Sequence, residues 1–172
     1  MTINGRGMST ALKTILIAGL LTGLLDAAAA MVHSYFWNDV TPDRVWKYVA
    51  SGMVGMAAFT GGGGMVVLGL FCHFLVAFTV TIILFFLYPT VKRLRLPVFI
   101  TGAIWGLVVW TVMYWIVTPL SGTPPGRAPF ELVKVIPQLL IHIFLVGLPM
   151  TMVIHRHYAS RKHRGIIVSQ PL

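Results

Sequence analysis

Four long apolar stretches constrain this chain more than any other feature of its sequence. Each is bounded by charge, proline or glycine, and each is long enough to cross about 30 Å of hydrocarbon at about 1.5 Å per helical residue. The 172 residues are 57% hydrophobic and 10% charged, so most of the chain cannot face water. We therefore predict an all-α polytopic membrane protein, a single membrane domain over 1–172 built as a four-transmembrane-helix bundle. The predicted spans are 13–37, 65–88, 97–118 and 131–154.

The distribution of Lys and Arg predicts how these spans are oriented. Most basic residues flank the chain ends and the connection between spans two and three: Arg6, Lys13, Lys92, Arg93, Arg95, Arg156, Arg161, Lys162 and Arg164. The two other connections hold fewer: Arg44, Lys47, Arg127 and Lys134. Because positive charge is retained in the cytoplasm, both chain ends are predicted to face the cytoplasm. The cytoplasmic connection is only 89–96, so spans two and three are expected to form an antiparallel hairpin.

Residues 155–172 are predicted to form a basic cytoplasmic tail. The formal net charge of +9 would suggest nucleic acid in a soluble protein, but here the charge lies beside apolar spans and follows topology. We expect a lipid-bilayer partner and no nucleic acid. Juxtamembrane cations attract anionic lipid headgroups. The residues expected to contact them are Arg156, Arg161, Lys162 and Arg164.

The connection between the first two spans is predicted to contain a short interfacial helix at about 42–59 on the outer side. Thr41-Pro42-Asp43 has the pattern of an N-cap, a first-turn proline and an acidic first turn. Apolar residues then recur at helical spacing, which suits a helix lying in the membrane interface. Gly61 to Gly64 are expected to end this helix as a flexible joint. Pro137 and Pro149 are expected to bend the fourth span.

Three ionisable residues lie inside the predicted spans, where an ionised side chain is costly unless it faces protein or water. Asp26, His73 and His142 lie on spans one, two and four, each roughly 12 to 17 Å from the outer membrane face at helical rise. We predict that they share one layer near the midplane and form a buried polar centre. His33 and Gln138, on nearly the same helix faces as Asp26 and His142, are predicted to form its access path.

The sequence leaves three interpretations of this centre open. The residues can be interhelical hydrogen-bonding partners with a structural role. They can handle protons or ions, since imidazole and carboxylate groups relay protons. They can also hold a cofactor, with His73 and His142 binding haem b or a copper or zinc ion, which would make the chain a membrane anchor or accessory subunit of a respiratory complex.

Sulfur-containing residues and catalytic patterns add little to this choice. Thioethers on the outer side would suit Cu(I), although methionine is also a common gap filler. The methionines concerned are Met31, Met53, Met56 and Met65. Cys72 has no second cysteine to pair with, and it is expected to face away from His73 because neighbouring helical residues point to different sides. No nucleotide-binding, zinc-finger or nucleophile-elbow signature occurs, which favours a non-enzymatic protein.

Several short segments of spans two to four carry a family resemblance. They are Gly69-Leu-Phe-Cys-His73, Tyr88-Pro89 with its Lys-Arg turn, residues 118–125, and Gln138-Leu-Leu-Ile-His142 before the basic tail. Through them, residues 60–160 resemble the YagU-like family of small bacterial inner-membrane proteins, whereas span one, with Asp26, matches less well. The resemblance implies a protein of the bacterial inner membrane associated with acid tolerance, for which titrating histidines are apt. A bundle of only four spans often gains from partners, so a homo-oligomer or a larger membrane complex is also compatible with the sequence.

Overall fold

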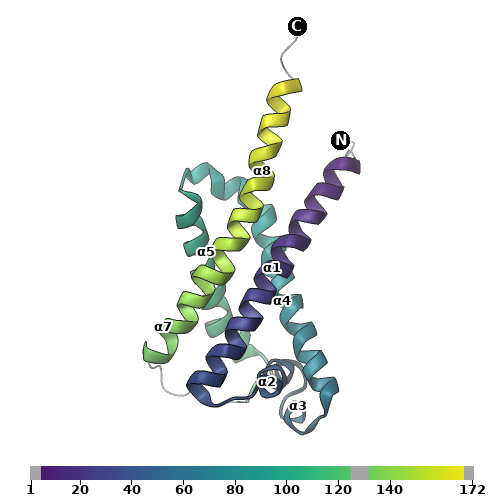
Figure 1. Cartoon of the computed structure of the whole chain (residues 1–172), viewed down its shortest axis with the longest axis vertical. Helices are drawn as coiled ribbons and strands as arrows, with labels where there is room; N and C mark the ends of the chain where they lie inside the picture. Colours follow the sequence, from purple (N-terminus) through teal and green to yellow (C-terminus); the bar gives the residue numbers. More distant parts are fainter. Residues whose placement is uncertain (1–4, 125–131, 169–172) are drawn as a thin grey trace.

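The computed structural model contains helices and no strands in the part of the chain that it describes, residues 5–124 and 132–168 (Figure 1). For residues 5–9, 132, 134 and 161–168 the backbone alone is described. Four helical segments are long and apolar enough to cross a membrane: Thr10–Asn38, Gly63–Leu94, Val98–Leu120 and Val135–Ser160. The predicted all-α bundle of four transmembrane helices is thus confirmed.

The helix bounds show where the regular α-helix gives way. The first two spans are α1 (Gly5–Asn38) and α4 (Gly63–Val91), and the 3₁₀ turn η1 (Lys92–Leu94) leads to the third. The third span comprises α5 (Val98–Val112), the π-helical segment η2 (Met113–Val117) and α6 (Thr118–Leu120). The fourth comprises α7 (Leu132–Ile141), the π-helical segment η3 (His142–Gly147) and α8 (Leu148–Val168). Such π-helical segments occur frequently at functional sites.

The two ends of the bundle differ in structure. Figure 1 shows the start of α1, the end of α8 and the α4–α5 turn at one end, which we term the terminal end. The helices α2 (Pro42–Val54) and α3 (Ala57–Thr60) lie at the other, which we term the α2 end. The single helix expected at 42–59 is therefore two helices, because Gly55 adopts φ +64, a left-handed conformation that ends α2. Gly63 and Gly64 belong to α4 instead of forming a joint.

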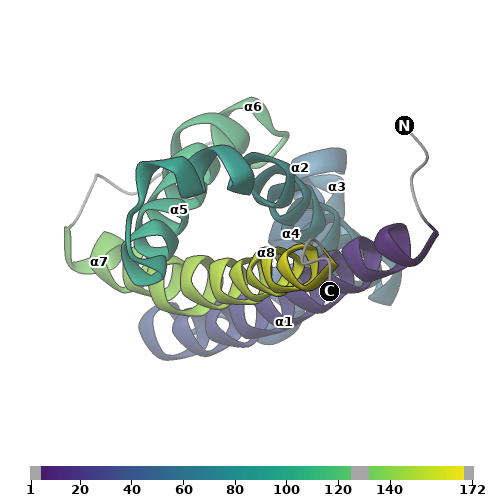
Figure 2. The ribbon, with the colours of Figure 1, turned by 90° about the horizontal axis from the view of Figure 1, so that it is seen from above.

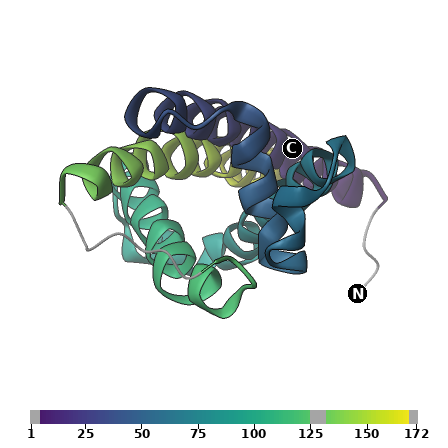
Figure 3. The same ribbon diagram turned by 90° about the horizontal axis from the view of Figure 1, so that it is seen from below.

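The predicted α4–α5 hairpin is joined by a short turn, but its two helices do not pack along their lengths. α4 packs on α1 and α2, whereas α5 packs on η3 and α8. Views along the bundle show α1 and α8 side by side, with α4 and α5 apart (Figures 2 and 3). The bundle therefore has a continuous α1–α8 layer with α4 and α5 diverging from it.

Glycine residues decide how closely α5 approaches the fourth span. A Cβ added at Gly106 would overlap the backbone of His142 and Ile143, and one at Gly147 would overlap Gly102 and Gly106. Only glycine therefore allows this backbone-to-backbone contact, which is typical of membrane helix packing. Pro149 is the second residue of α8, and since it has no N–H, the regular hydrogen bonding of the helix cannot continue unchanged there.

The core lies in the half of the bundle nearer the terminal end. Leu84, Met150 and Ile154 are fully buried there, together with the nearly buried Phe85 and Tyr88. Large apolar side chains on the outward helix faces are instead exposed, as lipid contact requires. The tail predicted from 155 begins as a continuation of α8, and its first turn is packed: Tyr158 donates a hydrogen bond of 2.9 Å to the carbonyl of Phe85.

Candidate functional site

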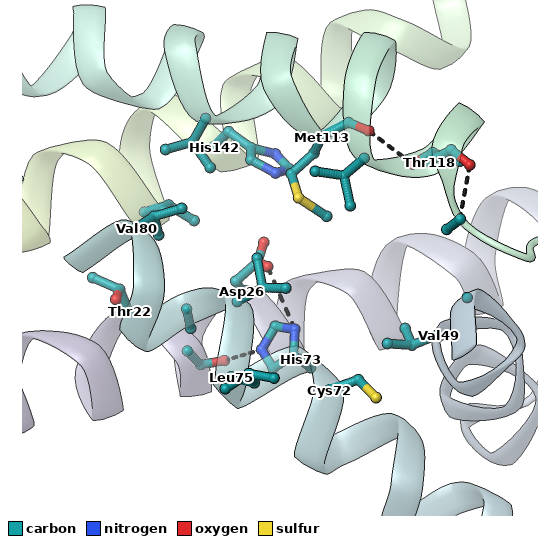
Figure 4. Close-up of a pocket in the computed structure, with 18 of the residues that line it drawn as sticks. Thr22, Asp26, Val49, Cys72, His73, Leu75, Val80, Met113, Thr118 and His142 are labelled. Carbon is teal, nitrogen blue, oxygen red and sulfur yellow. Dashed lines mark hydrogen bonds and ion pairs between the residues drawn. The ribbon is translucent and has the colours of Figure 1, made fainter. Parts of the chain in front are cut away.

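A cavity of about 330 Å³ lies between the spans in the half of the bundle nearer α2 (Figure 4). Its walls come from α1, α2, α4, the third span and the fourth span, and most of its lining side chains are apolar. The divergence of α4 from α5 leaves this space, because neither helix fills the room between them. Asp26, His73 and His142 all line it, so the structure brings the three predicted residues of the polar centre to one cavity.

His73 is held in place by its surroundings on α1, α2 and α4. A Cβ at Gly69, one helical turn earlier, would overlap the carbonyl of Trp46, so glycine at this position lets α2 lie against α4. The Trp46 ring then lies edge-on to the His73 ring, with 5.5 Å between centroids. On the other side, His73 Nε2 lies 2.9 Å from the carbonyl oxygen of Gly23.

This hydrogen bond determines which nitrogen of the His73 ring carries hydrogen. A carbonyl oxygen can only accept, so Nε2 carries hydrogen and donates to Gly23. In the neutral ring Nδ1 then has no hydrogen, and it lies 4.0 Å from Asp26 Oδ2. An unprotonated nitrogen beside a carboxylate is unfavourable. Both atoms are then acceptors, so a hydrogen bond between them requires a proton on one of the two groups.

His142 lies on the opposite wall of the cavity, across from Asp26 (Figure 4). It is the first residue of η3, and its Nδ1 donates a hydrogen bond of 2.8 Å to the carbonyl of Gln138. Its Nε2 is consequently the nitrogen left to accept a proton or a ligand. Asp26 and His73 on one wall and His142 on the other give the cavity polar groups on two sides.

The predicted access path does not coincide with this cavity. His33 stacks on Trp37 with 5.4 Å between ring centroids, and its buried Nε2 has no hydrogen-bond partner within the described residues. Neither His33 nor Gln138 lines the cavity. The role of these two residues in access remains a prediction. The cavity itself extends toward α2, where Tyr48, Val49, Gly52 and Met53 line it.

The cavity wall at the α2 end includes a hydrogen-bonded turn, and its place at the cavity was not predicted. Thr118 donates from Oγ1 to the carbonyl of Met113, five residues earlier, at 2.8 Å, as the π-helical geometry of η2 allows. Ser121 and Thr123 both donate to the carbonyl of Thr118, and the N–H of Gly122 donates to the carbonyl of Gly52 on α2 at 2.9 Å. The turn thus ties the third span to α2. The turn-forming residues around Pro119 indicated a turn in the sequence, but not its contact with α2.

Of the two histidines predicted to bind haem or a metal, only His142 has the hydrogen-bond pattern of a ligand. Ligating histidines normally donate their second ring nitrogen to a carbonyl or carboxylate, and His142 follows this pattern, with Nε2 left to ligate. On His73 it is Nδ1, facing Asp26, that is left. No group of three His, Cys, Asp or Glu side chains able to hold a metal ion occurs among residues with described positions.

Cys72 differs from its predicted position, whereas nothing in the described part of the chain contradicts the predicted outer-side position of the methionines. Cys72 was expected to face away from His73, yet both line the cavity. Cys72 Sγ lies 3.1 Å from Met53 Sδ. Of the four methionines considered for Cu(I), Met53 lines the cavity, whereas Met31, Met56 and Met65 do not.

The predicted lipid-contacting tail is described only in part. Arg156 is exposed on α8, as lipid-headgroup contact requires. The side chains of Arg161, Lys162 and Arg164 lie outside the described residues. His155, at the predicted start of the tail, shares a hydrogen bond of 2.7 Å with the hydroxyl of Tyr88, so this position belongs to the packed bundle.

No protein-family model, curated protein or solved structure matches the chain.

Proposed function

We propose that this integral membrane protein takes up and releases protons at the Asp26–His73 pair. The observation that carries the proposal is the hydrogen bond from His73 Nε2 to the Gly23 carbonyl, because it directs the other ring nitrogen toward Asp26 Oδ2 at 4.0 Å. In this geometry a proton on either group would join two acceptors that otherwise cannot hydrogen-bond each other. The cavity beside it gives that proton a route to and from the pair.

The other groups around the pair support this role. Tyr48, Cys72 and His142 are the remaining titratable residues that line the cavity in the described part of the chain, and no Lys or Arg lines it. Without a fixed positive charge, a proton is the available partner for the Asp26 carboxylate. His142 across the cavity offers a second proton acceptor, which suits a relay.

The two halves of the bundle give the proposed exchange a direction. The cavity extends toward the α2 end, whereas the half nearer the terminal end is filled by the core around Leu84 and Ile154. Proton exchange is therefore expected from the α2 side in this conformation. The excess of basic residues at the terminal end supports a cytoplasmic position for that end, so the α2 side would face outward.

This direction agrees with the resemblance to the YagU-like family. That resemblance implies a bacterial inner membrane and a link to acid tolerance, and a site that takes protons from the outer side suits both. Assembly into a homo-oligomer or a larger complex, and contact of the tail with anionic headgroups, stay predictions of the sequence.

Proton flux in reconstituted vesicles tests the proposal. Vesicles that enclose a pH-sensitive dye should lose an imposed pH gradient when they contain the wild-type protein. Asp26→Asn keeps the shape of the side chain and removes its charge, and His73→Gln can still donate to Gly23, so both variants should fold. We expect both to reduce flux to the level of protein-free vesicles. Asp39→Asn, the same change at an exposed carboxylate that does not line the cavity, should leave flux unchanged.

Two further measurements separate transport from proton binding. Infrared difference spectra between neutral and acidic pH should show a carboxyl band that disappears in Asp26→Asn and shifts in His73→Gln. If the band behaves in this way and no flux occurs, the protein senses protons instead of conducting them. If Asp26→Asn leaves the spectrum unchanged, the pair does not bind the proton and the proposal fails.

The haem- or metal-anchor alternative has weaker support from the site. His142 has the hydrogen-bond pattern of a ligating histidine, but the nitrogen of His73 that would ligate faces a carboxylate. An absorption spectrum and metal analysis of the purified protein decide this alternative. A Soret band that His73→Ala or His142→Ala removes would replace proton handling with haem binding as the assigned function.

A further inference from the structure

A second cavity of about 230 Å³ lies at the terminal end, where the α4–α5 turn meets α8. It is separate from the cavity beside Asp26, and the proposed proton exchange makes no use of it. Its lining includes two cations, an aromatic hydroxyl, a histidine and the start of a helix. The residues are Tyr88, Val91, Lys92, Arg95, Leu96, Val98, Thr101 and His155.

The charge at this cavity is positive, and no described residue provides a counterion. Lys92 and Arg95 are exposed, and neither forms an ion pair with a described residue. The turn from 89 to 96 contains no Asp or Glu. Arg95 adopts φ 55 and donates its N–H to the carbonyl of Lys92 at 3.2 Å, so the turn holds both cations at one side of the cavity.

Hydrogen-bond donors on the other walls add to this positive site. Helix α5 begins at Val98, which lines the cavity, and the first N–H groups of a helix have no partner within it and carry the positive end of the helix dipole. Helix N-termini of this kind bind phosphate groups. The Tyr88 hydroxyl and His155 Nδ1 are joined by a hydrogen bond of 2.7 Å, which fixes both rings in the cavity wall.

The apolar surroundings indicate which phosphate compound fits. The cavity lies where two membrane spans end, and Leu94, Leu96 and Phe99 beside it are exposed large hydrophobic residues. A free anion would make no use of them, whereas acyl chains descending from a headgroup would cover them. We propose that this cavity binds the phosphodiester headgroup of an anionic phospholipid, with Lys92, Arg95 and the start of α5 as its partners.

Native mass spectrometry of the full-length protein in detergent tests this proposal with phosphatidylglycerol as the probe. Wild-type protein should retain phosphatidylglycerol more strongly than phosphatidylcholine with the same acyl chains. Lys92→Gln and Arg95→Gln should each weaken retention about fivefold, the effect expected for one basic residue near an anionic lipid. Arg93→Gln is the matched control, because Arg93 is an exposed cation of the same turn that does not line the cavity. It should change retention by less than about twofold.

Three results would overturn the proposal. Equal losses in all three variants would show diffuse attraction to the basic turn instead of a site. Equal retention of phosphatidylcholine would show that the anionic headgroup is not recognised. Displacement of phosphatidylglycerol by an equal concentration of inorganic phosphate would assign the cavity to the free anion. All three substitutions replace exposed side chains, so the variants should fold as the wild type does.

Discussion

The two halves of this bundle differ in packing: one has a close-packed core and the other contains a cavity. In the half nearer the terminal end, Leu84 and Ile154 are 1% and 0% exposed, and the Tyr88 and Tyr158 rings stack with 5.6 Å between centroids. In the half nearer α2, the same helices enclose a cavity of about 330 Å³ with Asp26 and His73 in its wall. Lipid is as apolar as a helix interface, so close packing holds membrane helices together. We infer that the close-packed half nearer the terminal end provides most of the stability, because the half nearer α2 contains a cavity and polar residues in place of a packed core.

The largest effect should come from removing the close approach of α5 to the fourth span. Gly147→Val would place a branched side chain against the backbone of Gly102 and Gly106, which cannot move without separating the helices. We expect a loss of about 4 kcal/mol or more, seen as little folded protein on size-exclusion chromatography.

Gly64→Val is the control for that experiment. Gly64 lies in α4, where an added Cβ has no neighbour within 4 Å, so the variant should fold. If Gly147→Val also folded normally, the terminal half would not depend on glycine-mediated contact, and the contrast between the halves would lose its basis.

A leucine-to-alanine pair on α4 compares the two halves directly. Leu84→Ala removes a side chain that is 1% exposed in the core and should cost about 2 kcal/mol, mostly through the cavity it leaves. Leu75→Ala removes one that is 54% exposed beside the existing cavity and should cost less than about 0.5 kcal/mol. Thermal unfolding in detergent measures both. Equal costs would mean that the α2 half is packed as firmly as the terminal half.

A backbone substitution tests whether the α2 half has a rigid connection. Gly55 adopts φ +64, which an L-residue with a Cβ adopts only with strain, so Gly55→Ala should destabilise by about 1 kcal/mol. Gly62→Ala, at a negative φ and in open space, should change stability by less than about 0.5 kcal/mol. Thermal unfolding distinguishes the two, and no difference between them would mean that the break between α2 and α3 adapts freely.

The smallest expected effect lies at the start of α2. The Thr41 hydroxyl donates a hydrogen bond of 2.6 Å to Asp43, and this bond, with Lys47 as a lesser cause, lowers the pKa of Asp43 below its ordinary 3.8. A carboxyl whose pKa is lower in the folded state stabilises the fold above its unfolded pKa, and that stability is lost as pH falls through the folded pKa.

Thr41→Ala should therefore raise the pKa of Asp43, measured by NMR titration of its carboxyl carbon, and should weaken α2 only above that range. Lys47→Gln should raise it less, because Lys47 contributes less to the shift. The Leu84 core should unfold as before in both variants. A pKa of Asp43 that does not move in Thr41→Ala would remove the hydrogen bond as its cause.

Some of the site followed from the sequence, and some did not. Asp26, His73 and His142 were predicted to meet because lone ionisable groups are too costly in hydrocarbon, and they do line one cavity, although their joint function stays a proposal. His33 and Gln138 were assigned to an access path from helix faces alone. Helix faces deduced from sequence spacing cannot show that α2 packs on α4 at Gly69 and provides part of the cavity wall.

The basic tail shows the same limit. Its charge pattern predicted a surface segment from residue 155, because cations at the end of an apolar span normally meet headgroups. His155 and Tyr158 are nevertheless held in the bundle by hydrogen bonds to Tyr88 and Phe85. Those partners lie about 70 residues earlier in the sequence, and no local pattern identifies them.

By itself the sequence determined that this chain forms four membrane-spanning helices, because apolar length and backbone hydrogen bonding in lipid allow no other solution. Only the tertiary structure decided that α4 and α5 diverge, that η2 and η3 depart from α-helical geometry, and that Asp26 faces Nδ1 of His73 instead of Nε2. These features depend on contacts between segments distant in the sequence, such as Gly106 against His142 and Gly69 against Trp46. Such contacts are set by the shapes of two surfaces together, and one segment read alone describes only one of those surfaces.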